Sequence, residues 1–359
     1  MNFEGVRRSI FDLTKEDLQE ILTAWGEPAF RANQVWQGVY QNLWDTPDQF
    51  TNLSRGLRER LFREFEFTTL VPEASLASTD GETTKILFRL RDGRAIETVL
   101  MRYNERRTLC ISTQAGCAMG CVFCATGQMG FKRHLTSGEI VEQVMVFARQ
   151  LKVTGERVTN VVVMGMGEPF HNYENTLSAV DRLNDASGFN LGARHFTIST
   201  VGIVPMILRF AREKRQVNLA ISLHAANDPA RTALLPINRK YPLDVLLDAC
   251  RQYAEMTHRR ITFEWALIRD VNDSTEVALE LAGRLRGLLC HVNVIPLNPT
   301  GRYPGQATTR ERAEAFKTVL ENHGIPCTIR IRRGIDIQAG CGQLAERVGA
   351  DKPSKPRMV

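Results

Sequence analysis

The sequence predicts an α/β protein: a partial, TIM-like (βα)6 barrel that follows a small helical domain and a β-hairpin. Three observations favour this fold. From about residue 103 onward, strand-like segments alternate with amphipathic helical segments at short spacing, a pattern typical of parallel βαβ units. The first 66 residues show helical periodicity instead, and two strand-like segments flank Asp92-Gly93 between these regions. With 359 residues, the chain has room for one barrel and an appendage.

Composition and charge narrow the functional class. Hydrophobic residues make up 43% and charged residues 24%, as in ordinary globular proteins. The chain has no apolar run of membrane-spanning length and no signal-peptide core, so we expect a cytoplasmic protein with no membrane partner and, by default, a monomer. Eight cysteines in such a protein favour metal-ligating or redox thiols over structural disulfides. The net charge of +6 is compatible with a polyanionic partner.

The elements follow in chain order, beginning with a helical accessory domain over residues 1–66. Thr14 caps a helix that ends near Gly26, a second helix begins near Phe30, and a third follows Ser54. Residues 67–102 form the hairpin segment, with strands at 85–90 and 95–101. The barrel spans 103–336, and 337–359 form a C-terminal segment that carries Cys341 and a basic tail. We expect barrel strands at 108–113, 160–164, 195–199, 218–223, 261–267, 291–296 and 327–331, and helices that begin near residues 136, 172, 205, 243, 275 and 309.

Three cysteines, Cys117, Cys121 and Cys124, carry the strongest chemical signal. Their C-x3-C-x2-C spacing fits three irons of a [4Fe–4S] cluster and leaves the fourth iron open to a substrate. They follow the first predicted barrel strand, and active sites of such barrels lie at the carboxyl ends of strands. The alternative is a structural zinc site with Cys110 as fourth ligand, although zinc sites favour two separated C-x2-C pairs.

Two further motifs point to the same end of the predicted barrel. Gly165-Met-Gly-Glu168-Pro169 follows the second strand; its glycines permit close approach to a ligand, and Glu168 offers an acceptor for an ammonium. The alternative is a tight βα turn. Cys341 lies between glycines, which favours an approachable, reactive thiol. We expect the other three cysteines to be buried and to act as small apolar residues. They are Cys250, Cys290 and Cys327.

Taken in order, these motifs resemble the radical S-adenosylmethionine (SAM) family of RNA methyltransferases that act on carbon 2 of adenine in 23S rRNA and tRNA. The resemblance covers essentially the whole chain. It rests on segments 26–31 (GEPAFR), 117–127 (CAMGCVFCATG), 164–169 (MGMGEP), 198–202 (ISTVG), 221–225 (ISLHA) and 341–344 (CGQL). It implies a radical-SAM barrel that holds a [4Fe–4S] cluster with one open iron, and SAM.

The resemblance also implies a role for each site residue. Cys117, Cys121 and Cys124 would ligate the cluster. One SAM would methylate Cys341, and a second would supply the 5′-deoxyadenosyl radical that activates this S-methyl group for addition to adenine. Glu97 would accept the proton that the adenine loses, and Cys110 would form a disulfide with Cys341 to release the product. The residues that would contact SAM are Gly167, Glu168, Ser199, Ser222, Leu223, His224 and Asn298.

The implied partners are 23S rRNA, tRNA and a flavodoxin- or ferredoxin-type electron donor. A flipped or unstacked adenine needs basic residues around it; the candidates are Arg106, Arg107, Arg330, Arg332 and Arg333. Three alternatives stay open. A related enzyme type methylates carbon 8 of the rRNA adenine and confers antibiotic resistance with the same cysteines, although Arg133-His-Leu-Thr136 and the long helical domain favour carbon 2. The others are a radical-SAM activase and a zinc-stabilised RNA-binding module.

Overall fold

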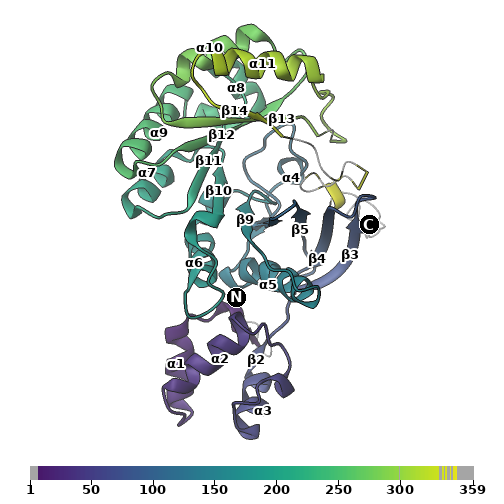
Figure 1. Cartoon of the computed structure of the whole chain (residues 1–359), viewed down its shortest axis with the longest axis vertical. Helices are drawn as coiled ribbons and strands as arrows, with labels where there is room; N and C mark the ends of the chain where they lie inside the picture. The colour runs from purple at the N-terminus through teal and green to yellow at the C-terminus, as the bar shows by residue number, and fades with distance from the viewer. Residues whose placement is uncertain are drawn as a thin grey trace, which may run out of the picture.

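The computed structural model describes residues 7–298, 300–330, 334, 336–337, 340 and 343–345. One ten-stranded sheet with the order β14-β13-β12-β11-β10-β9-β6-β5-β4-β3 organises the molecule (Figure 1). Its strands from β14 to β6 pair in parallel. These are β6 (Arg107–Cys110), β9 (Asn160–Val163), β10 (Phe196–Thr200), β11 (Asn218–Ser222), β12 (Ile261–Leu267), β13 (Cys290–Pro296) and β14 (Cys327–Ile329).

Helices connect the parallel strands and lie along the outer side of the curved sheet (Figure 1). They are α5 (Ser137–Val153), α6 (Tyr173–Asn184), α7 (Val204–Glu213), α9 (Leu243–Thr257), α10 (Thr275–Leu285) and α11 (Arg310–Asn322). Side chains of Thr136, Ser274 and Thr309 accept backbone N–H groups at three of the helix starts, which satisfies donors that the helix leaves open. Six βα units followed by a last strand confirm the predicted (βα)6 barrel. The structure adds two short helices, α4 (Ala125–Gln128) and α8 (Asp228–Leu234).

The predicted hairpin is confirmed, and it belongs to the same sheet. β4 (Thr83–Arg89) and β5 (Ala95–Arg102) pair antiparallel, and β5 pairs antiparallel with β6, with Val99 opposite Cys110. A further strand, β3 (Val71–Ala77), pairs with β4 and was not predicted. Because β5 lies beside β6, Glu97 and Cys110 occupy neighbouring strands rather than a linker and a barrel.

The predicted N-terminal helices form and pack against the barrel. They are α1 (Lys15–Ala24), α2 (Phe30–Tyr40) and α3 (Arg55–Glu64). A capping box between Thr14 and Asp17 begins α1. Trp36 Nε1 donates to Asp185 Oδ2 at 2.8 Å, and the Gly138 N–H donates to Asp12 Oδ1 at 2.8 Å. Two short strands, β1 (Arg8–Ser9) and β2 (Phe65–Glu66), pair in parallel and join the two ends of this domain. One apolar core runs from these helices into the barrel.

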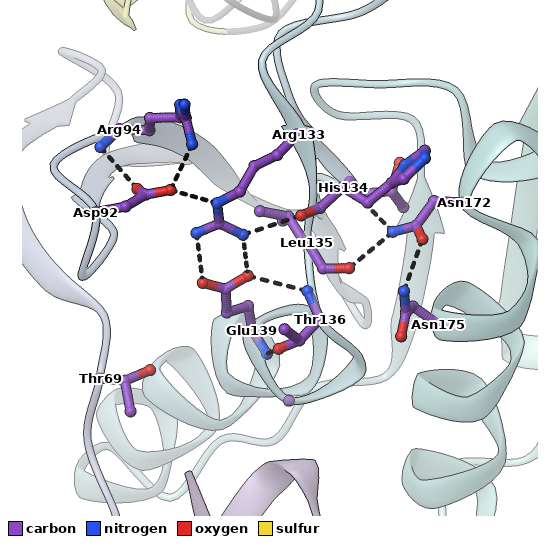
Figure 2. Close-up of polar contacts among 12 residues, drawn as sticks. Thr69, Asp92, Arg94, Arg133, His134, Leu135, Thr136, Glu139, Asn172 and Asn175 are labelled. Carbon is purple, nitrogen blue, oxygen red and sulfur yellow. Dashed lines mark hydrogen bonds and ion pairs between the residues drawn. The ribbon is translucent and has the colours of Figure 1, made fainter. Parts of the chain in front are cut away.

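Polar contacts close the long loop that leaves β6 and returns to α5 (Figure 2). Within it, β7 (Gln114–Ala115) pairs with β8 (Arg133–His134). The Asn172 side-chain amide donates to the carbonyls of Thr113 and Leu135, both at 2.9 Å, and so ties the two ends of the loop together. Arg133 binds both carboxylate oxygens of Glu139 at 2.7 and 2.8 Å and also contacts Asp92 in the hairpin turn.

Among the described residues, no helix combines the length and the apolar character needed to cross a membrane.

Candidate active site

The inner side of the sheet encloses a cavity of about 880 Å³. Almost all the predicted site residues that the structure describes line it, although they come from strands and loops that lie far apart in the sequence. These residues are Glu97, Cys110, Cys117, Cys121, Cys124, Gly167, Glu168, Ser199, Ser222, His224 and Asn298. Leu223 is buried beside the cavity without lining it. Cys341, Arg332 and Arg333 lie outside the described residues, whereas Gly340, directly before Cys341, lines the cavity.

The cysteine loop folds tightly against its own end. The Cys117 N–H donates to the Gly130 carbonyl at 3.3 Å. Gly116 has φ +74°, and a Cβ there would stand 1.9 Å from the same carbonyl oxygen, so the position requires glycine. Cys124 and Cys121 are linked by a backbone hydrogen bond of 3.2 Å, which curls the C-x2-C segment into a turn. The local sequence therefore holds the three thiols at one edge of the cavity.

The chemistry of this donor set fits an iron–sulfur cluster. Burial raises the pKa of Cys117 to about 12 and also raises the pKa of Cys121 and Cys124, so these thiols keep their protons until a metal displaces them. Among the described residues, no three His, Cys, Asp or Glu side chains gather as ligands of a single metal ion. A [4Fe–4S] cluster does not require three ligands around one metal ion, because each thiolate binds a different iron.

Cys110 has different charged neighbours from the three cysteines of the loop. Its charged neighbours are Arg330, Lys85 and Glu97, and burial raises its pKa to about 11 against the lowering effect of the two cations. This placement, on the side of Glu97, gives no support to Cys110 as the fourth ligand of a zinc site. The described cysteines are all free thiols, and Cys250, Cys290 and Cys327 are buried as expected.

Glu168 is a buried carboxylate in the loop that follows β9, and backbone N–H groups hold it. Its Oε1 accepts the Phe170 N–H and its Oε2 accepts the Val201 N–H, both at 2.9 Å. Burial raises the pKa of Glu168 to about 7, against the lowering effect of these donors. The preceding Gly167 has φ +108°, and a Cβ there would stand 2.6 Å from the Gln114 side chain. The loop thus brings backbone and carboxylate against the cavity, as the sequence motif predicts.

His224 presents one ring nitrogen to the cavity side of the sheet. Its Nδ1 accepts the Ala266 N–H at 2.9 Å, so the ring proton sits on Nε2 as a donor. Burial lowers the pKa of His224 to about 3, which keeps the ring neutral at physiological pH. Phe123, from the cysteine loop, meets the ring edge-on with centroids 5.0 Å apart. His224 therefore joins the loop after β11 to the cysteine loop.

Arg231, on α8, holds the strand ends around the site and was not predicted from the sequence. Its side chain is fully buried. Nη2 donates to the carbonyls of Val201 at 2.7 Å and Ser222 at 3.2 Å, and Nε donates to the carbonyl of Leu223 at 3.2 Å. One guanidinium thus fixes the loops after β10 and β11. In the sequence, an arginine on a short helix is indistinguishable from a solvated one.

Glu97 is buried in an ion pair rather than solvated. Lys85 Nζ lies 2.6 Å from Glu97 Oε2, and the two side chains are 0% and 1% exposed. The Ala345 N–H donates to Glu97 Oε1 at 2.7 Å, and Lys85 Nζ also donates to the Gly340 carbonyl at 2.7 Å. The lysine and glutamate therefore bind the chain on both sides of Cys341 to the hairpin strands. No sequence pattern revealed Lys85.

A second cavity, of about 740 Å³, adjoins the first at the amino ends of the strands. Arg106 and Asn160 line both cavities. The guanidinium of Arg106 lies over the Tyr103 ring, 5.1 Å from its centroid, and Arg157 also lines the second cavity. Among the described residues, neither arginine forms an ion pair with a carboxylate, whereas Arg107 pairs with Glu156.

Comparison with known proteins matches both parts of the chain to families. The family model of the radical SAM superfamily matches residues 111–282, and that of the ribosomal RNA large subunit methyltransferase N-terminal domain matches residues 9–67. The chain is 52% identical over 340 residues to the dual-specificity RNA methyltransferase RlmN 1 of Myxococcus xanthus, covering 95% of each chain. It is 49% identical to a probable dual-specificity RNA methyltransferase RlmN of Chloroflexus aurantiacus, covering 97% of this chain and 95% of the relative.

A solved structure shows the same fold. The radical SAM methyltransferase from Sphaerobacter thermophilus superposes with a TM-score of 0.91 at 51% identity, over 94% of this chain and 98% of that one. The two family models, the relatives' full-length identity and the shared fold agree with the site geometry. The protein therefore belongs to the RlmN family of the radical SAM superfamily.

Proposed function

We propose that this enzyme methylates carbon 2 of adenine in 23S rRNA and in tRNA through an S-methyl group on Cys341. The observation that carries the proposal is the shared cavity, which brings Glu97, Cys110, the cysteine loop and Gly340 to one space. The names of the relatives, dual-specificity RNA methyltransferases, support an RNA substrate. As a radical SAM protein, the enzyme uses a [4Fe–4S] cluster and SAM.

The chain's own residues divide between cofactor binding and chemistry. Cys117, Cys121 and Cys124 would hold the cluster, which supplies, together with SAM, a 5′-deoxyadenosyl radical. The SAM contacts would come from Gly167, Glu168, Ser199, Ser222, Leu223, His224 and Asn298. Arg231 binds the carbonyls of Ser222 and Leu223 and would thereby position two of these contacts.

Carbon 2 of adenine is electron-poor, so a radical carbon delivered by Cys341 is a suitable attacking group. Addition of the methylene radical to carbon 2 leaves an unpaired electron on the ring. The ring gives up this electron, for which the oxidised cluster would be the acceptor, and loses the hydrogen of carbon 2 as a proton, which Glu97 accepts. The Cys110 thiolate then attacks the Cys341 sulfur. A disulfide forms, the sulfur–methylene bond breaks, and its electron pair stays on the methylene carbon, which takes up a proton and becomes the methyl group.

The RNA would approach through the second cavity, from the amino ends of the strands. Arg106 stands at the junction of the two cavities and is free of carboxylate partners among the described residues, so it offers a contact for phosphate. Arg107, a candidate from the sequence, is held by Glu156 and is less suited. We include in this proposal an RNA-binding role for domain 1–66, a flavodoxin- or ferredoxin-type electron donor, and a cytoplasmic monomer.

The test is mass spectrometry of the tryptic peptide that spans residues 334–347, from protein purified without oxygen. We expect one added methyl group on Cys341, absent from the Cys341→Ala variant. A Cys341 that stays unmodified after cluster reconstitution and incubation with SAM would contradict the proposal. Nucleoside analysis of the reacted RNA then separates 2-methyladenosine from the carbon-8 product of the alternative reaction.

A further inference from the structure

Glu264, in the middle of β12, is a cavity residue without an assigned role. It lines the active cavity, is 5% exposed, and carries a carboxylate oxygen, Oε2, that has no hydrogen-bond partner in the described part of the chain. An unpaired buried carboxylate oxygen is costly, because its lost hydration is not replaced. A bound ligand that donates an N–H or O–H group would remove this cost.

The other oxygen of Glu264 is fixed by a short polar chain. Asn293 Nδ2 donates to Glu264 Oε1 at 3.1 Å, and His291 Nε2 lies 3.2 Å from Asn293 Oδ1. These contacts orient the carboxylate so that its free oxygen is held in one place before a ligand arrives. A carboxylate oxygen that is held in place in advance favours a ligand whose donor group lies at one particular position.

The strand register extends this site into a polar row. Ser222 of β11 lies opposite Glu264, Glu264 opposite Asn293, and Asn293 opposite Thr328 of β14, and all four line the cavity. Parallel strands in register place these side chains on the same face. The row therefore starts at a proposed SAM contact and runs across the cavity wall.

A nearby cation, Arg330, relates Glu264 to the part of the cavity that contains Cys110. Burial raises the pKa of Glu264 and of Cys110, and the guanidinium of Arg330, directly after β14, opposes this rise at both groups. One cation thus acts on Glu264 and on the proposed resolving thiol. The geometry agrees with these charges. Glu264, Arg330 and Cys110 line the same cavity, and the row of strand partners runs from Ser222 through Glu264 toward β14, which Arg330 follows.

We infer that Glu264 reads the exocyclic amino group of the target adenine in RNA. This inference rests on the proposed function and adds its base selectivity. A carboxylate oxygen accepts a hydrogen bond from the amino group of adenine. It opposes the carbonyl oxygen that guanine or hypoxanthine carries at the same carbon, so the contact selects by attraction and by repulsion.

The test compares RNA stem-loops that carry either adenosine or purine riboside, which lacks the amino group, at the target position. Equilibrium binding and turnover are measured with the reconstituted wild-type enzyme, Glu264→Leu and Glu264→Gln. The wild type should prefer adenosine by about 10- to 100-fold, as expected for a hydrogen bond to a charged group. Glu264→Leu should bind both RNAs equally. Each protein is compared on two RNAs, so a general loss of RNA affinity in a variant cancels and the ratio reports on this contact alone.

Controls separate this inference from the proposed function. Glu255→Leu, on the outer helix α9, should keep the wild-type preference for adenosine. Glu264→Leu should also keep wild-type SAM affinity and Cys341 methylation, which need no RNA. Loss of SAM affinity with an intact preference for adenosine would assign Glu264 to SAM and overturn the inference. Absent methylation of Cys341 in the wild type would contradict the proposed function, while the binding preference still reports on Glu264.

Discussion

The buried pair of Lys85 and Glu97 shows how one side chain depends on another at the residue scale. The Glu97 side chain is 1% exposed, and the Lys85 ammonium and the Ala345 N–H contact its two carboxylate oxygens. Lys85 supplies the cation and also acts on Cys110, whose pKa it lowers. Both proposed proton-dependent steps at this end of the cavity therefore depend on a lysine that has no direct role in bond making.

Lys85→Met should accordingly stall the reaction after RNA has joined Cys341. Without the ammonium, Glu97 Oε2 loses the partner that fixes it, and the lowering effect of Lys85 on the pKa of Cys110 is lost. We expect release of methylated RNA to slow by about 100-fold, with a covalent RNA–protein adduct visible on a denaturing gel. Lys317→Met, which removes a surface lysine 3.8 Å from Glu321, is the matched control. Normal product release without adduct would show that the pair is only structural.

His224 makes a prediction about pH. Its pKa is about 3 in the folded protein, below the ordinary value of 6.5, because burial disfavours the charged ring. The unfolded chain therefore binds a proton more readily, and stability falls as pH drops from about 6.5 toward 3. The free energy of unfolding, measured with urea, should fall less steeply on acidification in His224→Asn than in the wild type. We expect a difference of about 1 kcal/mol per pH unit between pH 6 and 4.

His258 offers a close control for this measurement. Both histidines have a left-handed backbone, with φ 59° at His224 and 55° at His258, and asparagine tolerates that conformation. His258 is exposed, so His258→Asn should leave the pH dependence of stability unchanged. Equal effects of the two substitutions would show that burial of His224 is not the cause.

At the scale of elements, the Arg133 contacts join the hairpin turn to the start of α5 (Figure 2). The guanidinium binds Glu139 through two parallel hydrogen bonds, a geometry stronger than a single surface ion pair. Because Asp92 belongs to the turn between β4 and β5, the same arginine also fastens the strands that carry Lys85 and Glu97.

Arg133→Ala should therefore destabilise the protein by about 1 kcal/mol in urea unfolding, with the effect reduced at high salt. Hydrogen exchange should rise in the peptide that contains Asp92. Arg55→Ala is the comparison, since the Arg55 side chain is 87% exposed and pairs with Glu59 on an outer helix face; it should change stability very little. An Arg133→Ala variant as stable as Arg55→Ala would show that the contacts are incidental.

Elements were predictable from sequence where local signals are strong. Thr136 and Thr309 marked helix starts because a capping side chain acts on the next few residues alone. β3 escaped prediction because its residues are exposed or half-buried and show no apolar alternation. Lys85, Arg231 and Glu264 escaped because their burial follows from strand pairing and packing of distant segments, which single-sequence periodicity does not contain.

At the scale of the whole molecule, the two adjoining cavities suggest one path for RNA. Arg106 and Arg157 are exposed cations on that path without carboxylate partners among the described residues. A double reversal, Arg106→Glu with Arg157→Glu, should weaken RNA binding about 10-fold and reduce the salt dependence of binding by roughly two counterions. Methylation of Cys341 should not change, because it needs no RNA.

A double reversal of equal charge, Arg212→Glu with Arg286→Glu, tests whether the position matters. Both residues are exposed, one on α7 and the other at the end of α10. Equal loss of RNA affinity in the two double variants would mean that overall charge, rather than the second cavity, attracts the RNA.

The N-terminal helices have little freedom to swing relative to the barrel. A Cβ at Gly138 would stand 2.5 Å from Asp12, and one at Gly188 would stand 2.8 Å from Trp36 Nε1, so the two bodies touch backbone to side chain. If domain 1–66 binds an RNA stem, as proposed, its fixed position beside the cavity would favour an adenine that lies at a set distance and angle from that stem. The enzyme would then select its RNA by the folded shape of the substrate before it recognises a base.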